Sequence, residues 1–400
     1  MRRMLRVILA ALLVPSALAC RRADEPAPLP PATRSDVPTV PLAPGTRLYE
    51  VNGVRVLTLY GTPEEMGRAH GTLLRDDVRW VVETVVRGTV ASDDARREAF
   101  LARVDVMERH LKDAWRRELR ALADAAGVDY RELVALQLFG DVERAPMCSS
   151  FAVFGRATAT GECVVGRNFD YWYEEVARRA SIILDYHPKD GRRFVTLSWA
   201  GVINGWTLMN DAGIVAANNT AYSAGANSLE GISTCFMLRK VAEEAATVDE
   251  GAIIVERGPR ACSTNLIIAG GNPPAAAVAE YDHERIVVRR AKDGFILATN
   301  SFLELGETAA EEPTYGRYGV MNGLIRENYG KIDRTMNFAG ADGVPIESIN
   351  LHSALMFPKD LTFRAAMGAV PACRGEFKWF RMTPDGIAPA NDQPKQEPTR

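Results

Sequence analysis

The sequence predicts an α+β protein in which a helical segment is followed by two sets of short strands. Apolar residues recur at helical spacing between residues 62 and 127, whereas from residue 151 onward they form short runs separated by Gly, Asp and Asn turns. The chain has 400 residues, of which 47% are hydrophobic and 25% are charged. A chain of this kind can bury a large core, in one large domain or in two.

Three helices are expected in the N-terminal part. The first begins at the N-cap Thr62, with Pro63 at its first position and Glu65 completing a capping box; the second ends at Gly127, and the third begins at the Asp129 cap. The apolar face of the first helix contains Met66, Ala69, Leu73, Leu74, Val78, Val81 and Val85, and that of the second contains Phe100, Val104, Met107, Leu111, Trp115, Leu119 and Leu122. Such helices need a further layer to pack against.

Strands are expected in two sets, with helices between them. The first set comprises residues 151–154, 163–169, 182–186, 194–199, 202–209 and 214–217. The second set comprises residues 263–269, 276–281, 286–290 and 295–298. Ser233 and Thr247, the latter with Glu250, are interpreted as the N-caps of two intervening helices.

Charge and histidine spacing exclude several functions. The formal net charge is -3 and there is no long Lys/Arg tract, so no nucleic-acid partner is expected. Histidines at 70, 110, 187, 283 and 352 show no HxxxH or HExxH spacing, so neither a metal site nor a cofactor is expected. We interpret His70 as a cap or packing residue of the helical layer.

Residues 1–20 have the pattern of a bacterial lipoprotein signal peptide. Three early arginines precede an apolar run at 7–14 and the exit Ala-Leu-Ala-Cys, which ends at Cys20. Residues 21–44 contain seven prolines and are expected to form an extended tether. The protein is therefore expected to be exported to the bacterial cell envelope and anchored to the membrane through a lipid on Cys20, with ordinary cleavage nearby as the alternative.

The chemical signal begins at Cys148. This residue stands at the head of the first predicted strand, in Met-Cys-Ser-Ser-Phe-Ala (147–152), and Arg167 and Asp170 lie in the segment Gly-Arg-Asn-Phe-Asp (166–170) that ends the next strand. A segment Met-Asn-Asp-Ala-Gly follows at 209–213. A thiol becomes a strong nucleophile when a base removes its proton, and no Cys-His pair is evident.

This order of motifs resembles the cysteine N-terminal-nucleophile hydrolases. Within them it resembles the penicillin (isopenicillin N) acyltransferase family of autoproteolytic acyltransferases and hydrolases, with bile salt hydrolases and penicillin V acylases as relatives. The likeness covers residues 50–380 and implies a four-layer alpha-beta-beta-alpha sandwich. It also implies cleavage before Cys148, a helical segment 45–147 that becomes the alpha subunit, a catalytic domain 148–383 that becomes the beta subunit, and a polar tail 384–400.

The resemblance assigns roles to the charged residues around Cys148. Arg167 is expected to lie beside the sulfur and to help hold it ionised, and Asp170 to position the amine that cleavage of the Met147–Cys148 bond would release. Arg317, in Tyr-Gly-Arg-Tyr (315–318), matches a late arginine of the family that braces the catalytic end. A surface position at the start of a helix is the alternative for Arg317.

Two asparagines are expected to bind the oxyanion. Asn219 matches the family's Gly-Leu-X-Val-X-X-Asn strand and is expected to donate a hydrogen bond, through its backbone N–H or its side chain, with the neighbouring Asn218 as the alternative. Asn300, in Thr-Asn-Ser-Phe (299–302), is expected to supply the second donor from its side chain. Donors of this type usually make the largest electrostatic contribution to acyl-transfer catalysis.

Once the Met147–Cys148 bond is cut, the α-amine of Cys148 can serve as the missing base. We therefore expect hydrolysis of a linear amide or N-acyl small molecule, or acyl transfer to an amine, with hydrolysis favoured by the predicted export. The alternatives are a ceramidase-like or phospholipase-B-like lipid hydrolase, and an inactive tethered protein that binds acylated peptides or lipids. The sequence leaves the oligomeric state open. The remaining cysteines at 163, 235, 262 and 373 are interpreted as packing residues with at most one disulfide.

Overall fold

The computed structural model describes residues 41–90, 93–143, 147–221, 227–306 and 316–391. The predicted signal peptide with Cys20, most of the tether 21–44 and the end of the predicted tail lie outside these ranges. From Leu42 onward the described chain forms one compact unit. None of the helices in these ranges is long and apolar enough to cross a bilayer.

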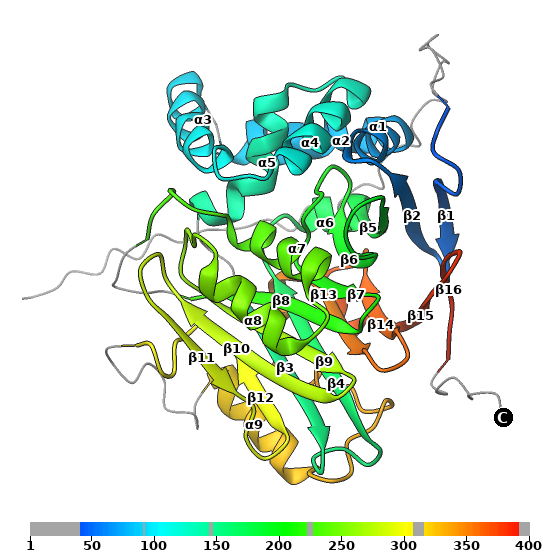
Figure 1. The fold of residues 1–400 in the computed structure, drawn as a ribbon, viewed down its shortest axis with the longest axis vertical. Helices are drawn as coiled ribbons and strands as arrows, with labels where there is room; N and C mark the ends of the chain where they lie inside the picture. Colours follow the sequence, from blue (N-terminus) through cyan, green and yellow to red (C-terminus); the bar gives the residue numbers. More distant parts are fainter. Residues whose placement is uncertain (1–40, 91–92, 144–146, 222–226, 307–315, 392–400) are drawn as a thin grey trace, which may run out of the picture. The chain divides into compact units, whose positions relative to one another are not determined.

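The helices and strands of Figure 1 have the following bounds. The helices are α1 Pro63–Leu73, α2 Arg75–Val82, the π-helix η1 Glu83–Val90, α3 Asp94–Glu108, α4 Asp113–Ala126, α5 Tyr130–Glu143, α6 Glu174–Ala180, α7 Thr234–Glu244, α8 Val248–Arg257 and α9 Gly316–Glu327, with short 3₁₀ turns η2 Glu347–Ile349 and η3 Ala372–Arg374. The strands are β1 Arg47–Val51, β2 Val54–Gly61, β3 Met147–Gly155, β4 Gly161–Asp170, β5 Ser181–Pro188, β6 Phe194–Trp199, β7 Thr207–Asn210, β8 Ile214–Thr220, β9 Thr264–Gly271, β10 Pro274–Tyr281, β11 Ile286–Arg290, β12 Phe295–Ala298, β13 Asn350–Phe357, β14 Thr362–Met367, β15 Lys378–Thr383 and β16 Gly386–Pro389.

The strands form two sheets. The nine-stranded sheet has the order β1-β2-β5-β6-β7-β8-β9-β10-β11, and the seven-stranded sheet has the order β12-β3-β4-β13-β14-β15-β16. Strand β2 runs parallel to β5, and the other neighbouring pairs run antiparallel. The two sheets meet face to face.

Three apolar clusters separate four layers. The cluster between the sheets joins residues such as Val195 of β6 to Val165 of β4. Helices α1 to α5 and α7 pack on the outer face of the nine-stranded sheet, and α9 packs on the outer face of the seven-stranded sheet through Met321 and Ile325. The predicted four-layer sandwich is confirmed by this order of helix, sheet, sheet and helix (Figure 1).

The predicted helix starts are confirmed where a local cap defines them. Thr62 accepts a hydrogen bond from the Glu65 backbone N–H and donates its own N–H to the Glu65 carboxylate, which completes the capping box. Asp129 accepts from the Glu132 N–H at the start of α5. Ser233 and Thr247 cap α7 and α8 in the same way.

The second predicted helix is wrong in one respect, because it is two helices. Helix α3 ends at Glu108, a turn follows, and α4 begins at Asp113. The apolar positions on both sides of the turn, including Met107 and Leu111, enter the same core cluster. Their spacing therefore stays helical across the break and conceals it.

The predicted strands differ from the structure at several points. Within the predicted strand 202–209, β7 begins only at Thr207, and the preceding residues form a turn in which Gly205 has a φ of 68°. Strands β1 and β2 and strands β13 to β16 were not predicted. Strand β16 (Gly386–Pro389) falls inside the predicted polar tail and pairs with β15.

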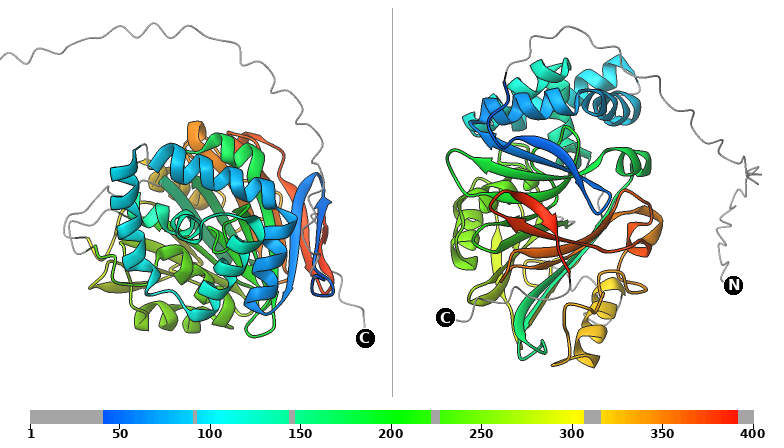
Figure 2. Two further views of the ribbon diagram at one scale, coloured as in Figure 1. Left: turned by 90° about the horizontal axis from the view of Figure 1, so that it is seen from above. Right: turned by 90° about the vertical axis from the view of Figure 1, so that its right-hand side faces the viewer.

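The N-terminal segment is built into the sandwich through β1 and β2. These strands form the edge of the nine-stranded sheet, next to β5. They also lie beside the last strand of the seven-stranded sheet (Figure 2), where the Tyr49 hydroxyl donates to the Ile387 carbonyl and accepts from the Ile387 N–H. Residues before and after Cys148 thus share one sheet and one core.

Helices α1 and α4 approach each other closely at two glycines. A Cβ atom added at Gly67 would lie 2.1 Å from the Glu118 carbonyl oxygen, and one added at Gly71 would lie 2.4 Å from the Leu122 carbonyl oxygen. Both obstacles are helix backbone, which cannot move without displacing α4. The absence of a side chain at these two positions sets the distance between the helices.

Gly67→Ala is therefore expected to destabilise the fold. The added methyl must push α4 away from α1, and overpacking of this kind costs about 1–3 kcal/mol of unfolding free energy. Urea unfolding followed by circular dichroism measures this difference.

Gly140→Ala is the matched control, because a Cβ there meets nothing within 4 Å. It replaces glycine in helix α5 and is expected to stabilise the protein by up to about 1 kcal/mol. Equal stability of the two variants would contradict the close approach of α1 and α4.

Candidate active site

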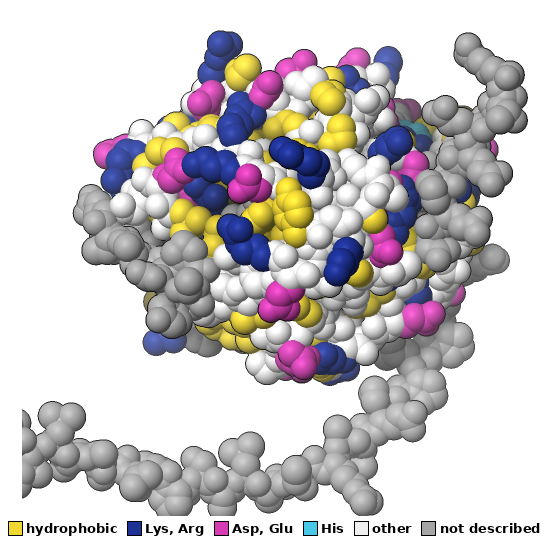
Figure 3. Space-filling model, turned by 90° about the horizontal axis from the view of Figure 1, so that it is seen from below, with side chains coloured by type: hydrophobic (Ala, Val, Ile, Leu, Met, Phe, Trp, Pro, Cys, Tyr) yellow, Lys and Arg dark blue, Asp and Glu magenta, His cyan; other side chains and the backbone are white. Residues whose placement is uncertain are grey.

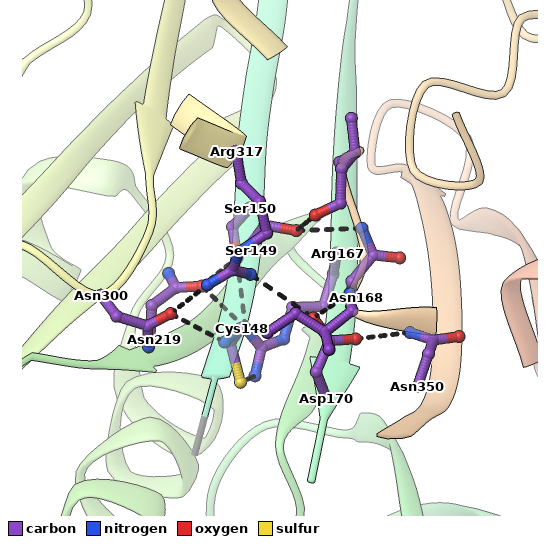
Figure 4. Close-up of polar contacts among 12 residues, drawn as sticks. Cys148, Ser149, Ser150, Arg167, Asn168, Asp170, Asn219, Asn300, Arg317 and Asn350 are labelled. Carbon is purple, nitrogen blue, oxygen red and sulfur yellow. Dashed lines mark hydrogen bonds and ion pairs between the residues drawn. The ribbon is translucent and has the colours of Figure 1, made fainter. Parts of the chain in front are cut away.

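The predicted site residues come from five places in the fold and meet at one end of the sheets (Figure 4). Cys148 begins β3, Arg167 and Asp170 lie on β4, Asn219 lies on β8, Asn300 follows β12, and Arg317 is in the first turn of α9. The structure brings all six of these residues together. Met147, on the other side of the predicted cleavage point, is exposed.

The pairing of β3 with β4 places Arg167 near the cysteine. The ladder sets Cys148 opposite Phe169 and Ser150 opposite Arg167. Residues opposite each other point to the same face of a sheet, and alternate residues share a face, so Cys148 and Arg167 both face the space between the sheets. Gly166 permits this pairing, since a Cβ atom there would lie 2.1 Å from the Phe151 ring on β3.

The thiol of Cys148 is buried and contacts a cation. Its Sγ atom lies 3.1 Å from Nη2 of Arg167, and the residue is 1% exposed. Burial raises the pKa of the Cys148 thiol above its ordinary value, and the positive charge of Arg167 opposes that shift. In the uncut chain the thiol is thus protonated at neutral pH and lies beside the group that would stabilise its anion.

Asn219 connects the nine-stranded sheet to Arg167. Its Oδ1 atom accepts from Nη1 of Arg167 at 2.9 Å and from Ser150 Oγ at 3.1 Å. The Nδ2 atom therefore points away from the guanidinium, and it is buried without a hydrogen-bond partner among the described residues. Asn218 is opposite Leu266, a residue of the helix-side core, so its side chain points to the other face of the sheet.

Asn300 meets the backbone of Cys148 through its oxygen. The Cys148 N–H donates to Asn300 Oδ1 at 3.0 Å, and Nη2 of Arg317 donates to the same oxygen at 2.6 Å. The Nδ2 atom of Asn300 donates to the Thr220 carbonyl. In the uncut chain Asn300 is therefore an acceptor at the cysteine nitrogen, a contact that the sequence did not predict.

Asp170 is a buried carboxylate with several donors. It accepts from Asn350 Nδ2 at 2.7 Å and from the Ile346 N–H at 3.0 Å, and Nη1 of Arg317 lies 3.4 Å away. Burial nevertheless outweighs these contacts and raises the pKa of Asp170 to about 6. The carboxyl therefore titrates close to the pH at which most proteins work.

Three further residues contribute to the site and were not predicted from the sequence. Ser150 donates to Asn219, Asn350 donates to Asp170, and Asn265 of β9 donates to the backbone next to Asn300. The alternation of β3 places Ser150 on the same face as Cys148 and would have indicated it. Asn350 and Asn265 become neighbours of the site only through strand pairing.

His70 and the other cysteines lie outside the candidate site. His70 is fully buried in α1, where its Nε2 accepts from the Gly201 N–H, and burial lowers its pKa to about 3, so it is neutral. The five cysteines in the described ranges form no disulfide with one another. The same ranges contain no group of three His, Cys, Asp or Glu side chains that could hold a metal ion.

The fold and this site define the class of protein. Two face-to-face sheets lie between helical layers, and a cysteine at the head of a central strand contacts an arginine of the neighbouring strand β4 and an asparagine just after the neighbouring strand β12. This arrangement is that of the fold class to which the N-terminal-nucleophile amidohydrolases and acyltransferases belong.

Residues 158–338 match the family model described as acyl-coenzyme A:6-aminopenicillanic acid acyl-transferase. The resemblance to penicillin acyltransferases predicted from the sequence is confirmed over this segment. The segment contains Arg167, Asp170, Asn219, Asn300 and Arg317, and it begins after Cys148.

The chain is also similar to individual proteins. It is 24% identical over 277 residues to protein dcd1A of Dictyostelium discoideum, which covers 60% of this chain and 62% of that protein, so the chain spans less than two thirds of this relative. A solved Caenorhabditis elegans ortholog of N-acylethanolamine-hydrolyzing acid amidase is 18% identical, over 53% of this chain and 93% of that one, with a TM-score of 0.42. A variant of the conjugated bile acid hydrolase from Clostridium perfringens is 12% identical, over 62% of this chain and 99% of that one, with a TM-score of 0.42.

Asp170→Asn is expected to flatten the pH dependence of stability between about pH 4 and pH 7. The folded-state pKa of about 6 lies above the ordinary value of 3.8, so the folded chain holds the proton more tightly than the unfolded chain. This stabilisation is fully present below the unfolded-state pKa of 3.8 and is lost as the pH rises through 6, and the loss amounts to about 3 kcal/mol by pH 7. Urea unfolding across this range, with Cys148→Ala in both proteins to keep the chain uncut, measures the slope.

Asp282→Asn is the control for this experiment. The Asp282 carboxylate also accepts two backbone N–H groups, but its pKa is lowered from 3.8, so it titrates below this pH range. Its removal should leave the slope unchanged. Identical slopes for Asp170→Asn and its parent would show that Asp170 is not the group that titrates.

Proposed function

We propose that the protein is an autoproteolytically activated cysteine amidohydrolase that cleaves a linear amide or N-acyl bond through an acyl-thioester on Cys148. One observation carries this proposal: the two atoms of Cys148 that the reaction needs have separate polar partners. The sulfur contacts Arg167, and the backbone nitrogen contacts Asn300. A cysteine with only a packing role has no need of either contact.

The first proposed step converts the uncut chain into the enzyme. The Cys148 thiol adds to the Met147 carbonyl carbon, the C–N bond breaks, and the thiol proton ends on the departing nitrogen. Water then cleaves the resulting thioester, which leaves a carboxylate on Met147 and a free thiol and α-amine on Cys148. Arg167 supports this step because it favours the thiolate over the buried thiol.

In the proposed cleaved enzyme the α-amine of Cys148 is the base. Its reference pKa of about 7.7–8.0 suits proton transfer near neutral pH. It takes the thiol proton, the thiolate adds to the substrate carbonyl, and the proton passes to the leaving amine. Water then hydrolyses the acyl-thioester, with the same amine as its base. Asn300 Oδ1 and Asp170 are the groups proposed to orient this amine.

The negative oxygen formed during this addition needs donors. We assign the first to Nδ2 of Asn219, which is buried and has no partner among the described residues. The second is the side-chain Nδ2 of Asn300, which also donates to the Thr220 carbonyl. Donors of this kind stabilise the transition state most when the fold has already oriented them.

Export, a lipid on Cys20 and a small-molecule substrate belong to the same proposal. Hydrolysis is preferred over acyl transfer because acyl-coenzyme A should be scarce outside the cytoplasm.

The face seen in Figure 3 carries basic and acidic side chains interspersed, which gives that face no single-sign patch for a polyanion. Turnover measured on a panel of N-acyl amino acids, penicillins and lipids distinguishes the proposed amidase from the lipid-hydrolase alternative.

The purified wild-type protein is expected to consist of two chains, of which the larger begins at Cys148. Cys148→Ala should remain a single chain and lose turnover of every amide in the panel, because it lacks the sulfur that forms both thioesters. Intact-mass spectrometry and N-terminal sequencing identify the cut.

Cys262→Ala serves as the control for this experiment, since Cys262 is also buried and forms no disulfide, and its sulfur lies near the backbone carbonyls of Asp141 and Ser228. It should be cut and active like the wild type. An uncut wild-type chain with full amidase activity would refute the proposed mechanism, and unchanged properties of Cys148→Ala would favour the binding-protein alternative.

Asn219→Ala is expected to lower kcat by about 100-fold to 1000-fold, the usual effect of removing one oxyanion donor. Steady-state kinetics on the best amide of the panel measures this effect. Asn218→Ala is the matched control, because its side chain points to the opposite face of the same strand. A loss of less than about tenfold for Asn219→Ala would assign the oxyanion to other donors.

A further inference from the structure

Three polar side chains of the nine-stranded sheet form one row across neighbouring strands. The ladder pairs Asn219 of β8 with Asn265 of β9, and Asn265 with Glu280 of β10. Paired residues point to the same face of a sheet, and Asn219 points toward Arg167 on the facing sheet. All three side chains are therefore directed into the layer between the sheets, where each is fully buried.

The second member of the row, Asn265, holds the backbone on both sides of Asn300. Its Nδ2 atom donates to the Thr299 carbonyl at 2.9 Å and to the Ser301 carbonyl at 2.8 Å. Asn300 itself lies beyond the end of β12, so the sheet ladder does not fix it. Both hydrogens of one amide thus clamp the residue whose oxygen accepts from the Cys148 N–H.

The third member, Glu280, holds the next part of the same loop. Its carboxylate accepts from three successive backbone N–H groups, those of Leu303, Glu304 and Leu305, at 2.8 to 3.0 Å. Successive N–H groups of this kind form a concave anion site. A buried carboxylate requires such partners, since without them its desolvation would be very costly.

Arg289 of β11 completes this anchor. It donates to the Glu280 carboxylate and, through Nη2, to the Leu297 carbonyl of β12 at 3.0 Å. The ion pair therefore joins the last strand before the loop to the carboxylate that binds the loop. Residues 297 to 305 are attached to the nine-stranded sheet at both ends and next to Asn300.

We propose that Asn265 and Glu280 are positioning residues for the reaction, which hold Asn300 at the nitrogen of Cys148. This inference rests on the proposed function, because it assumes that the Asn300 contact serves cleavage and turnover. A displacement of about 1 Å in a reacting site can lower a rate by about 100-fold. Neither residue touches Cys148, so each acts only through the loop.

The first test compares Asn265→Leu with Asn210→Leu. Asn210 of β7 is buried in the same sheet, and its Nδ2 atom likewise donates to two backbone carbonyls, those of Ala242 and Ala245, away from the site. Asn265→Leu should lower kcat and the self-cleavage rate about 10-fold to 100-fold, with KM changed less than about threefold. Asn210→Leu should keep both rates per folded molecule. Equal losses in the two variants would reduce Asn265 to a structural role and overturn the proposal.

A double-mutant cycle then tests whether Asn265 acts through Asn300. Asn300→Ala alone should lower kcat more than Asn265→Leu alone, and the double variant should be no slower than Asn300→Ala. Independent, multiplicative losses would contradict the proposal. Measured kcat values of all four proteins, normalised to the folded fraction, complete the cycle.

The last test does not depend on activity. In Glu280→Gln, hydrogen exchange at the amides of residues 303 to 305 should become at least about tenfold faster, with exchange in β3 unchanged. Unchanged exchange at these amides would overturn the clamp even in a fully active enzyme. Conversely, the wild type could show neither self-cleavage nor turnover while exchange at residues 303 to 305 still becomes faster in Glu280→Gln. This result would refute the proposed function and the positioning role, and it would leave the clamp as a structural feature.

Discussion

The guanidinium of Arg167 lies between the two sheets, almost completely buried, and the geometry of the site depends on it. It contacts the Cys148 sulfur with one nitrogen and Asn219 with another, and no carboxylate bonds it within the described ranges. A buried cation without a bonded anion favours ionisation of the nearest acidic group. Burial raises the pKa of the Cys148 thiol, and the positive charge of Arg167 beside it opposes this shift without cancelling it.

Local signals in the sequence predicted local structure well. The capping box at Thr62 and the caps at Asp129, Ser233 and Thr247 depend on residues three positions apart, so the sequence displays them directly. The break between α3 and α4 was not predicted, because the helical spacing of apolar residues continues through it. Strand β13 was missed because all its residues are buried between two layers, which removes the alternation by which strands are recognised.

The residues of the candidate site could be predicted where a single segment of the sequence contains them. Cys148, Arg167 and Asp170 stand in two short motifs, and the choice between Asn218 and Asn219 follows from the alternation of a strand once its inner face is known. Asn265 and Glu280 could not be predicted, because their importance arises from ladder pairs between strands and from a loop that they reach across the core. Which atom of the Asn300 amide faces the Cys148 nitrogen, the oxygen or the nitrogen, likewise depends on neighbours that only the fold brings together.

Strands β1 and β2 lie at the edge of the nine-stranded sheet, beside β5 and β16, although they precede Cys148 in the chain. If the Met147–Cys148 bond is cut, these strands remain interleaved with the larger piece, but nothing covalent returns them after unfolding. A linked segment has an effective concentration near its partner of about millimolar, which a free fragment in dilute solution does not approach. The peptide bond would thus be needed to assemble the sandwich but not to maintain it, and the cut protein would persist mainly because its unfolding is slow.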